Sequence, residues 1–425
     1  MSFLPTAVEL GRRAALAMLA SLLLCYALAA TGLMGWPVLV AFAIFLVSAL
    51  LALPAVRDLR VSPLVLVACA LVLIALGSPS DGWDPRSIWL FHAKRIFLEG
   101  SLYAQLDDYA PWSHNDYPAL VPLLMASAAG LLGHWNELLP KAVAPLLLLP
   151  ALLLIAPSLR SRWLVALFAL LLLSTGREML LNGYMDALVA VYAVAVVATA
   201  VRARTTGGRP RAGELIAFVL LVAVLSMLKN EGAVLAAVLT ASVLVDGLLR
   251  ERRLAWHIVL AVLVALLPLL AWKLSVDGAG VGNDLAGSDM KGQLLARLGS
   301  DGGSQLILKR LLLDAWVLVP LLLLAVFWRR TLRTPVAMTS LLAALAAAIW
   351  WWPADPGKAM MVAVAVLIVW LGTLWLGMSG GSWVGHALGG ALLVYALCGL
   401  LLPTLRVPVG SERWLGPLCG LLTGI

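Results

Sequence analysis

Apolar runs nearly long enough to cross a lipid bilayer recur along most of this chain. Residues 187–201 and 254–272 are two examples, and a window of about 20 residues finds about twelve or thirteen candidate helices. Hydrophobic residues make up 63% of the sequence, charged residues make up 12%, and the mean hydropathy is +1.00. An ordinary globular core cannot cover so much apolar surface, so the sequence predicts an all-α, polytopic transmembrane helix bundle in the lipid bilayer.

Basic residues gather in short connectors at 57–60, 202–211, 250–253 and 329–333. Short cytoplasmic connectors of membrane proteins carry an excess of Lys and Arg, so this pattern sets the orientation of the helices and argues against a nucleic-acid partner. We expect one integral domain without internal repeats. It would comprise a hairpin at 1–60, a core at 61–255 with external loop 78–118, and C-terminal helices at 256–425 with external loop 276–305.

Three further features concern individual segments of the chain. The apolar run 119–133 is too short to cross the bilayer in full, so we expect a re-entrant or in-plane helix there. The four cysteines lie within apolar runs without metal-ligand spacing, which favours packing roles. Residues 14–31 follow a pair of arginines without a clear cleavage site and are expected to be a retained anchor.

The mixed clusters of acidic and basic residues stand at the ends of apolar runs, at 81–89, 113–118, 176–186 and 228–232. With the arginine connectors on the cytoplasmic side, all four clusters come out on the opposite face. No P-loop, dinucleotide-binding fingerprint or HExxH motif occurs, and the GxSxG match at 377–381 lies between apolar runs. The sequence therefore predicts a site at the water boundary of the outer face.

The first external loop opens with Asp84 followed by Pro85. This pair is a natural helix start, so a simple N-cap is one interpretation of Asp84. The aromatic and basic residues that follow, including Arg86 and Lys94, are typical of a helix that lies in the headgroup layer. Such a helix would place the Asp84 carboxylate beside lipid headgroups, with Asp81 as a nearby competitor.

The same loop ends with His114, Asp116 and Tyr117, just before the next apolar run. A polar helix cap is the structural alternative for these residues. His114 has no second histidine at metal spacing, which argues against zinc. The imidazole remains a candidate donor to a phosphate or a sugar hydroxyl.

Charges also mark the later helix ends. Asp186 lies about one turn inside its apolar run, where a carboxylate usually faces a cavity or a partner. An ion pair with Arg177 that closes the bundle is the alternative. Lys229 and Glu231 flank a Gly-marked break between two helices, where a solvated turn is the alternative and contact of Lys229 with an anionic headgroup is the functional interpretation.

Several of these motifs follow one another in a distinctive order across residues 61–250. They are Trp-Asp at 83–84, Lys-Arg at 94–95, Gly100, His-x-x-Tyr-Pro at 114–118, GYMDA at 183–187 and KNEG at 229–232. This order resembles that of the bacterial GT-C glycosyltransferases, closest to protein-mannosyltransferase-like and aminoarabinose-transferase-like members. The family often carries His-Pro-Pro where this chain has His-Asn-Asp, and residues 255–425 show no feature that matches.

The resemblance implies an inverting enzyme of the bacterial inner membrane. It would move a sugar from a polyprenyl-phosphate carrier to an unknown glycan, lipid or protein acceptor at the extracytoplasmic face. Asp84 would be the base, with Asp81 as its competitor, because an acceptor hydroxyl needs a positioned base. The remaining candidates, which would bind the substrate, are Arg86, Lys94, His114, Asp116, Tyr117, Arg177, Asp186, Lys229 and Glu231.

Metal dependence and a rival function stay open at this point. Asp81, Asp84 and Asp116 could hold a divalent cation, Mg²⁺ or Mn²⁺, but a monophosphate leaving group does not require one, so we predict no metal site. A transporter or flippase of a lipid-linked or anionic substrate is the alternative, with Asp186, Lys229 and Glu231 along its pathway. A non-catalytic scaffold is the third interpretation.

Overall fold

The computed structural model describes residues 6–282 except 81, 108, 160–164, 167, 170–171, 174–179, 182, 206–211 and 252–255. Asp81, Arg177 and almost all of the expected loop at 276–305 lie outside the described residues. Residues 1–237 and 257–282 form one compact unit, and residues 238–256 and 283–425 form another. All candidate site residues that the structure describes belong to the first unit.

The described secondary structure is entirely helical, which confirms the all-α prediction for this part of the chain. Four segments are long and apolar enough to cross a membrane: Ala7–Ala30, Trp36–Arg57, Leu138–Ser158 and Ile258–Gly278. The α-helices are α1 (Ala7–Ala30), α2 (Trp36–Leu51), α3 (Ser62–Gly77), α4 (Leu90–Glu99), α5 (Leu120–Leu132), α6 (Leu138–Leu146), α7 (Leu148–Ile155), α10 (Asp186–Thr205), α11 (Ala212–Leu228), α12 (Asn230–Glu251) and α13 (Trp256–Gly278). Shorter helical turns are η1 (Leu53–Arg57), η2 (Pro85–Trp89), η3 (Pro111–Ser113) and η4 (Ala156–Ser158).

The helix boundaries follow from local sequence. The Thr6 hydroxyl accepts a hydrogen bond from the backbone N–H of Glu9 and caps α1. Proline stands in the first turn of α2 and of α3, where its missing N–H costs no helical hydrogen bond. At the other end of α4, Gly100 adopts a left-handed conformation with φ of 65°, which stops the helix.

Large apolar side chains cover the outside of several helices. Leu50, Leu66 and Leu73 are among those exposed on α2 and α3, and Leu263, Leu267 and others are exposed on α13. A helix that is apolar on its outer as well as its inner face is typical of a membrane span, because lipid can solvate the outer face. This pattern agrees with the membrane prediction.

The short helix α5 lies inside the bundle. Its residues from Leu120 to Ala129 are all buried, and it packs against α4, α6 and α2. Thirteen residues span about 20 Å at the helical rise of ~1.5 Å per residue, less than the ~30 Å of a hydrocarbon core. The short run is therefore an interior helix that is too short to cross a bilayer by itself.

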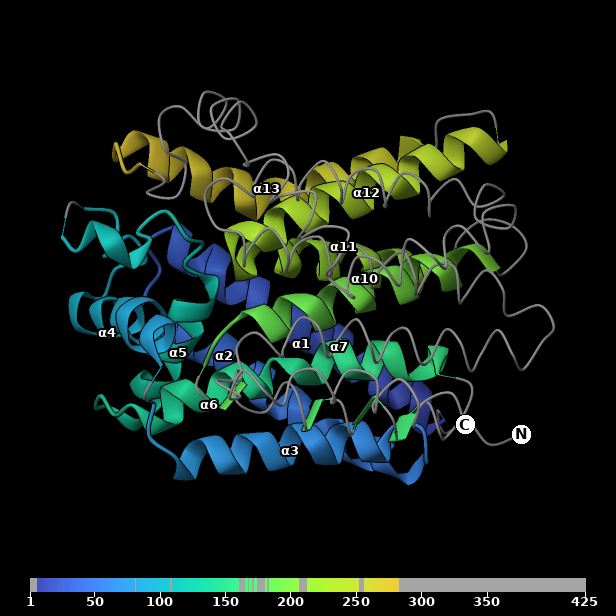
Figure 1. Cartoon of the computed structure of the whole chain (residues 1–425), viewed down its shortest axis with the longest axis horizontal. Coiled ribbons are helices and arrows are strands. Elements are labelled where there is room, and N and C mark those ends of the chain that lie inside the picture. Colours follow the sequence, from blue (N-terminus) through green and yellow to red (C-terminus); the bar gives the residue numbers. More distant parts are fainter. Residues whose placement is uncertain are drawn as a thin grey trace, which may run out of the picture. The chain divides into compact units, whose positions relative to one another are not determined.

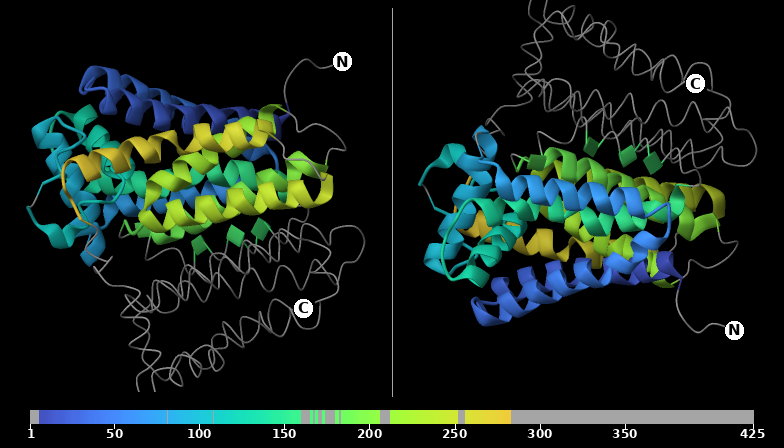
Figure 2. Two further views of the ribbon diagram at one scale, coloured as in Figure 1. Left: turned by 90° about the horizontal axis from the view of Figure 1, so that it is seen from above. Right: turned by 90° about the horizontal axis from the view of Figure 1, so that it is seen from below.

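The helix ends that carry the charged motifs meet at one end of the first unit. Figures 1 and 2 show α4 at the end where α10 begins and α11 ends. Contacts from Asp116 in the loop after α4 to Asn230 at the start of α12 and to Trp272 in α13 place those elements there as well. We call this region, which holds residues 78–118 and these helix ends, the loop end.

Arginines occupy a separate cluster, where α10 ends and both α1 and α11 begin. Arg202 of α10 pairs with Glu214 of α11, and a Cβ atom on Gly213 would lie 2.4 Å from Nη1 of Arg12 in α1. We call this region the arginine end. Within the described residues, the charged motifs at 82–89, 113–118, 183–186 and 228–232 therefore gather at one end, and Arg12 and Arg202 lie at the other.

Candidate functional site

A buried lysine lies between two carboxylates at the loop end. Nζ of Lys229 lies 2.8 Å from Oδ1 of Asp186 and 3.7 Å from Oε1 of Glu231. The exposed fractions of these side chains are 2% for Lys229, 12% for Asp186 and 10% for Glu231. The alternative of a solvated turn at KNEG is therefore wrong. Because Gly232 has no side chain, the start of α12 can pack closely on the backbone oxygen of Leu225, with Lys229 and Glu231 buried beside it.

The sequence offered Arg177 as an ion-pair partner of Asp186. Arg177 lies outside the described residues, whereas Lys229, from the break between α11 and α12, supplies the observed ion pair. With two carboxylates around one ammonium, the group carries an excess of negative charge. A carboxylate excess in a buried setting marks a functional-site candidate rather than a stabilising pair.

Asp116 is held by residues from the starts and ends of distant helices. Its Oδ2 accepts a hydrogen bond of 2.7 Å from Nδ2 of Asn230 and lies 3.6 Å from Nζ of Lys273. Its backbone oxygen accepts a hydrogen bond from Nε1 of Trp272 at 3.0 Å. The helix-cap alternative for Asp116 is wrong, because α5 begins after Ala119 without a side-chain cap.

Tyr117 is the aromatic centre of the site. Its ring stacks on His114 at 4.8 Å and packs on Trp89 at 5.8 Å between ring centroids, and Nζ of Lys229 lies 5.9 Å from its centroid. His114 reaches this position from a left-handed backbone conformation with φ of 56°, which is strained for a residue with a side chain. Burial, then the charge of Glu231, raises the pKa of Tyr117, so the phenol stays protonated.

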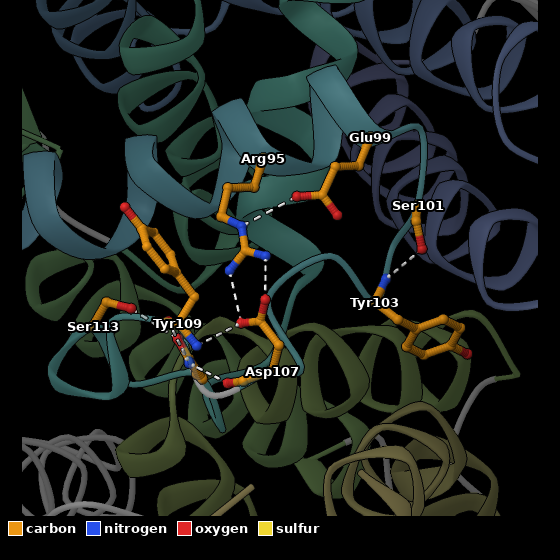
Figure 3. Close-up of polar contacts among 8 residues, drawn as sticks. Arg95, Glu99, Ser101, Tyr103, Asp107, Tyr109 and Ser113 are labelled. Atoms are coloured by element: carbon orange, nitrogen blue, oxygen red, sulfur yellow. Dashed lines mark hydrogen bonds and ion pairs between the residues drawn. The ribbon is translucent and has the colours of Figure 1, made fainter.

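A second set of contacts fixes the loop that carries these residues. Arg95 of α4 makes a two-pronged ion pair with Asp107, at 2.9 and 2.7 Å, and a longer contact with Glu99 (Figure 3). The Arg95 guanidinium holds the pKa of Asp107 below its ordinary value. Nε2 of Gln105 donates to the backbone oxygens of Asn115 and Tyr117.

His92 supports the loop from inside α4. One ring nitrogen, Nε2, lies 2.8 Å from the backbone oxygen of Ser113, and the side chain is completely buried. Burial lowers the pKa of His92 to about 4, despite the opposing hydrogen bond to Ser113. The imidazole is therefore neutral near pH 7, with Nε2 as the N–H donor to that carbonyl.

Asp84 is not a simple helix cap. Its backbone is already helical, with φ of −54° and ψ of −48°, and its side chain makes no capping hydrogen bond. Residues Pro85–Trp89 after it form a π-helical turn. Insertions of this kind in α-helices occur frequently at functional sites. The interpretation of Asp84 as an N-cap through its side chain is therefore wrong, and the half-buried residue takes part in other contacts.

Tyr184, from the GYMD segment, packs directly on the backbone that leads to Asp84. A Cβ atom on Gly82 would lie only 2.7 Å from the ring of Tyr184. Burial and the charge of Asp84 raise the pKa of Tyr184. Asp84 and Asp186 both act electrostatically on this phenol, so it connects the first loop with the start of α10.

The remaining sequence candidates are not part of the buried cluster around Lys229. Arg86 and Lys94 are exposed on η2 and α4 and make no ion pair with the residues that the structure describes. Asp81 and Arg177 lie outside those residues. No group of three or more His, Cys, Asp or Glu side chains within the described residues is arranged to hold a metal ion, so a divalent cation has no candidate site there.

Sequence reasoning missed several polar residues of the loop end. Lys141 of α6 is fully buried, and its ammonium donates to the backbone oxygen and the hydroxyl of Ser78 in the chain leading to Asp84. The signal was available, because a single lysine within an apolar run usually has a functional or structural partner. Tyr184 and Asn230 lie in the GYMDA and KNEG motifs without having been singled out, and Trp272 and Lys273 offered no comparable signal.

Comparison of the chain with protein-family models, curated proteins and solved structures finds no match.

Proposed function

We propose that this chain is an integral membrane glycosyltransferase of the GT-C type. It would transfer a sugar from a polyprenyl-phosphate carrier to an acceptor at the extracytoplasmic face of the bacterial inner membrane. The resemblance in residues 61–250 suggests this reaction. The observation that carries the proposal is that the first loop and four helix ends bring their carboxylates and cations to one end of an apolar bundle.

Asp84 is the proposed base. The supporting features are its half-buried carboxylate, the lack of a capping role, and the π-helical turn that follows. The charge of Asp84 also acts on Lys229, so the base lies within electrostatic reach of the buried cluster. A carboxylate in a partly dehydrated setting can accept a proton from an acceptor hydroxyl and still be reached by substrate.

The proposed transfer reaction requires, besides this base, cations that stabilise the departing phosphate. Asp84 takes the proton of the acceptor hydroxyl while the acceptor oxygen bonds to the anomeric carbon. The bond from that carbon to the phosphate oxygen breaks, the electron pair leaves with polyprenyl phosphate, and the configuration inverts. Arg86 and Lys94, both exposed, and Lys273, partly exposed beside Asp116, are the proposed cations for the departing phosphate.

This assignment changes the role proposed for Lys229. Its ammonium is buried and already pairs with Asp186 and Glu231, so these two carboxylates would repel a lipid phosphate from it. We therefore assign Lys229 to positioning the two carboxylates.

Replacement of Asp84 by Asn tests the proposal. Purified protein in proteoliposomes would receive radiolabelled hexoses and pentoses on polyprenyl phosphate, and transfer to membrane glycan, lipid and protein fractions would be measured. We expect the wild type to transfer one of these sugars and Asp84→Asn to reduce the rate by about 10² to 10⁴, the usual contribution of general base catalysis. Asp58→Asn, in the connector after η1, is the matched control and should retain the wild-type rate.

Two results would contradict the proposal. Full activity of Asp84→Asn would remove the base assignment. Movement of the labelled lipid across the bilayer without any new covalent product would favour the transporter or flippase instead, for which the buried charges Asp186, Lys229 and Glu231 are the observation in favour. The same assay with and without EDTA tests dependence on a divalent cation.

A further inference from the structure

Among the buried side-chain polar atoms of the described residues that have no hydrogen-bond partner, three belong to residues linked by ring and charge contacts at the loop end. They are Nε1 of Trp89, the hydroxyl of Tyr117 and Oε2 of Glu231. Trp89 and Tyr117 are each 1% exposed. Buried side-chain polar atoms are nearly always paired in folded proteins, so three such atoms in one neighbourhood indicate that something absent from the chain completes them.

The three residues come from separate elements that meet at the loop end. Trp89 ends η2, Tyr117 lies before α5, and Glu231 is in the first turn of α12. The rings of Trp89 and Tyr117 lie 5.8 Å apart, and Lys229 links Tyr117 to Glu231 through contacts of 5.9 and 3.7 Å. Among the charged side chains that act on the Tyr117 hydroxyl, Glu231 has the largest effect on its pKa. We call these three residues the buried triad.

The hydrogen-bonding character of the buried triad selects its ligand. The Trp89 indole N–H can only donate, the Glu231 carboxylate can only accept, and the Tyr117 hydroxyl can do both. A phosphate oxygen without a proton cannot donate to Glu231, and an ammonium group cannot accept from Trp89. A hydroxyl group matches all three atoms, because it donates one hydrogen bond and accepts up to two.

The charge beside the buried triad also favours a neutral hydroxyl group as the ligand. The carboxylates of Asp186 and Glu231 outnumber the ammonium of Lys229 beside the buried triad. An anionic headgroup would be repelled there, whereas a neutral hydroxyl would not. The side chains of Asp186 and Glu231 keep about a tenth of their surface exposed.

We propose that the buried triad binds a hydroxyl group of the sugar carried by the lipid-linked donor, apart from the cations that meet its phosphate. Only the identification of the ligand as a donor sugar rests on the proposed function. The binding of a neutral hydroxyl-bearing group follows from the buried triad itself. The Tyr117 hydroxyl donates to the sugar oxygen, the Trp89 N–H supports it, and the sugar hydroxyl donates to Oε2 of Glu231.

Sugar-selective binding tests this proposal without any need for transfer. The probes are farnesyl phosphate, which has no sugar, and its glucosyl, mannosyl, galactosyl and arabinofuranosyl derivatives, titrated into purified protein in detergent. Tyr117→Phe removes only a hydroxyl, and Tyr109→Phe makes the same change on an exposed tyrosine of the same loop. We expect the wild type to bind one sugar derivative more tightly than farnesyl phosphate.

Tyr117→Phe should weaken that preferred derivative by about tenfold or more, since a site built to bind a hydroxyl group strongly depends on that bond. It should leave farnesyl phosphate within about twofold of the wild-type affinity, and Tyr109→Phe should change neither. One monodeoxy form of the preferred sugar should then bind wild type and Tyr117→Phe equally. If Tyr117→Phe does not fold, Trp89→Phe is tested in the same way.

Three outcomes would overturn the proposal. If Tyr117→Phe lowered the affinity for farnesyl phosphate and for its sugar derivative equally, Tyr117 would have a structural role. If it changed neither affinity, water alone would complete the buried triad. The absence of any sugar preference in the wild type would lead to the same conclusion. Sugar-selective loss at Tyr117 together with full activity of Asp84→Asn would retain the sugar site and reject the proposed base. Transfer that depends on Asp84 without sugar selectivity at Tyr117 would do the reverse.

Discussion

The two ends of the helix bundle arrange their charges in opposite ways. At the arginine end, Arg12 and Arg13 share the single carboxylate of Glu9, at 2.8 and 3.0 Å on the same helix. These side chains remain partly exposed, up to 65% for Arg13. Water and ions screen pairs of this kind, so each contributes about 0 to 1 kcal/mol.

At the loop end, two carboxylates share one cation. Asp186 and Glu231 flank Lys229, and all three side chains are at least mostly buried. Removing charges from water is costly, and the ion pair offsets that cost only if all its groups are satisfied. Because Oε2 of Glu231 has no partner among the described residues, the loop end retains an unmet hydrogen-bonding demand, whereas the described part of the arginine end shows no such atom. This difference shows that the number of charged residues does not distinguish a functional site from a connector. Buried charges whose hydrogen bonds are incomplete do distinguish it.

The largest effect should come from removing the shared cation. Lys229→Met leaves Asp186 and Glu231 buried without their partner, and we expect it to lower the free energy of unfolding by about 3 to 5 kcal/mol. Arg12→Met, its counterpart at the arginine end, should cost about 1 kcal/mol or less. Denaturant unfolding in detergent micelles, followed by tryptophan fluorescence, would measure both.

A second variant keeps this comparison interpretable. Lys229→Met combined with Asp186→Asn should recover part of the loss, because it removes one of the two unpaired charges. Equal costs for Lys229→Met and Arg12→Met would mean that the loop end is an ordinary connector, contrary to the contrast drawn above.

Acid should loosen the loop end selectively. The pKa of His92 is about 4 in the folded protein and 6.5 ordinarily. Between these two pH values, His92 is protonated in the unfolded chain but neutral in the folded chain. Stability therefore falls as the pH drops from about 6.5 to about 4, by up to about 3 kcal/mol for this group. Hydrogen exchange should show faster opening of residues 101–117 at pH 5 than at pH 7, with little change in residues 7–30.

His92→Gln provides the control for this pH dependence. Glutamine can still donate to the backbone oxygen of Ser113 but does not titrate. The variant should lose the extra opening at pH 5. If residues 101–117 opened equally in both proteins at pH 5, His92 would not be the group responsible.

The smallest effect should be found at the arginine end. Arg13→Ala removes a 3.0 Å contact with Glu9 from a largely exposed side chain, and we expect a change of about 0.5 kcal/mol or less in the free energy of unfolding. Raising the salt concentration to about 1 M should reduce this difference further, because exposed pairs are screened. A loss above about 1.5 kcal/mol that persists in salt would show that the arginine end is more than a screened connector.

Much of the helical framework could be predicted from the sequence. The apolar run at 187–201 lies in α10 (Asp186–Thr205), and the expected loop at 78–118 begins where α3 (Ser62–Gly77) ends. Apolar runs long enough to span a bilayer leave few other solutions, because backbone groups in lipid must be paired within the helix. The expected helix at 255–272 is α13, which continues to Gly278.

That small difference in α13 had a large consequence for the site. Ending the helix at 272 placed Lys273 outside it, whereas the structure keeps Lys273 in the helix and brings its ammonium to Asp116 and Asn230. No local pattern indicates such a contact, which joins residues 157 positions apart. Tyr184 was overlooked for the same reason, since its role depends on the close approach to Gly82.

The sequence by itself determined that this chain is helical, that it has helices fit for a membrane, and that its charged motifs fall at helix ends. Hydropathy and connector charge encode those properties residue by residue. Only the tertiary structure decided that Lys229 serves Asp186 and Glu231, that Asp116 is held from α12 and α13, and which buried atoms stay unpaired. Hydrogen bonds and ion pairs inside a bundle depend on how helix ends that are far apart in the chain pack together. The polarity of a single segment does not reveal that packing.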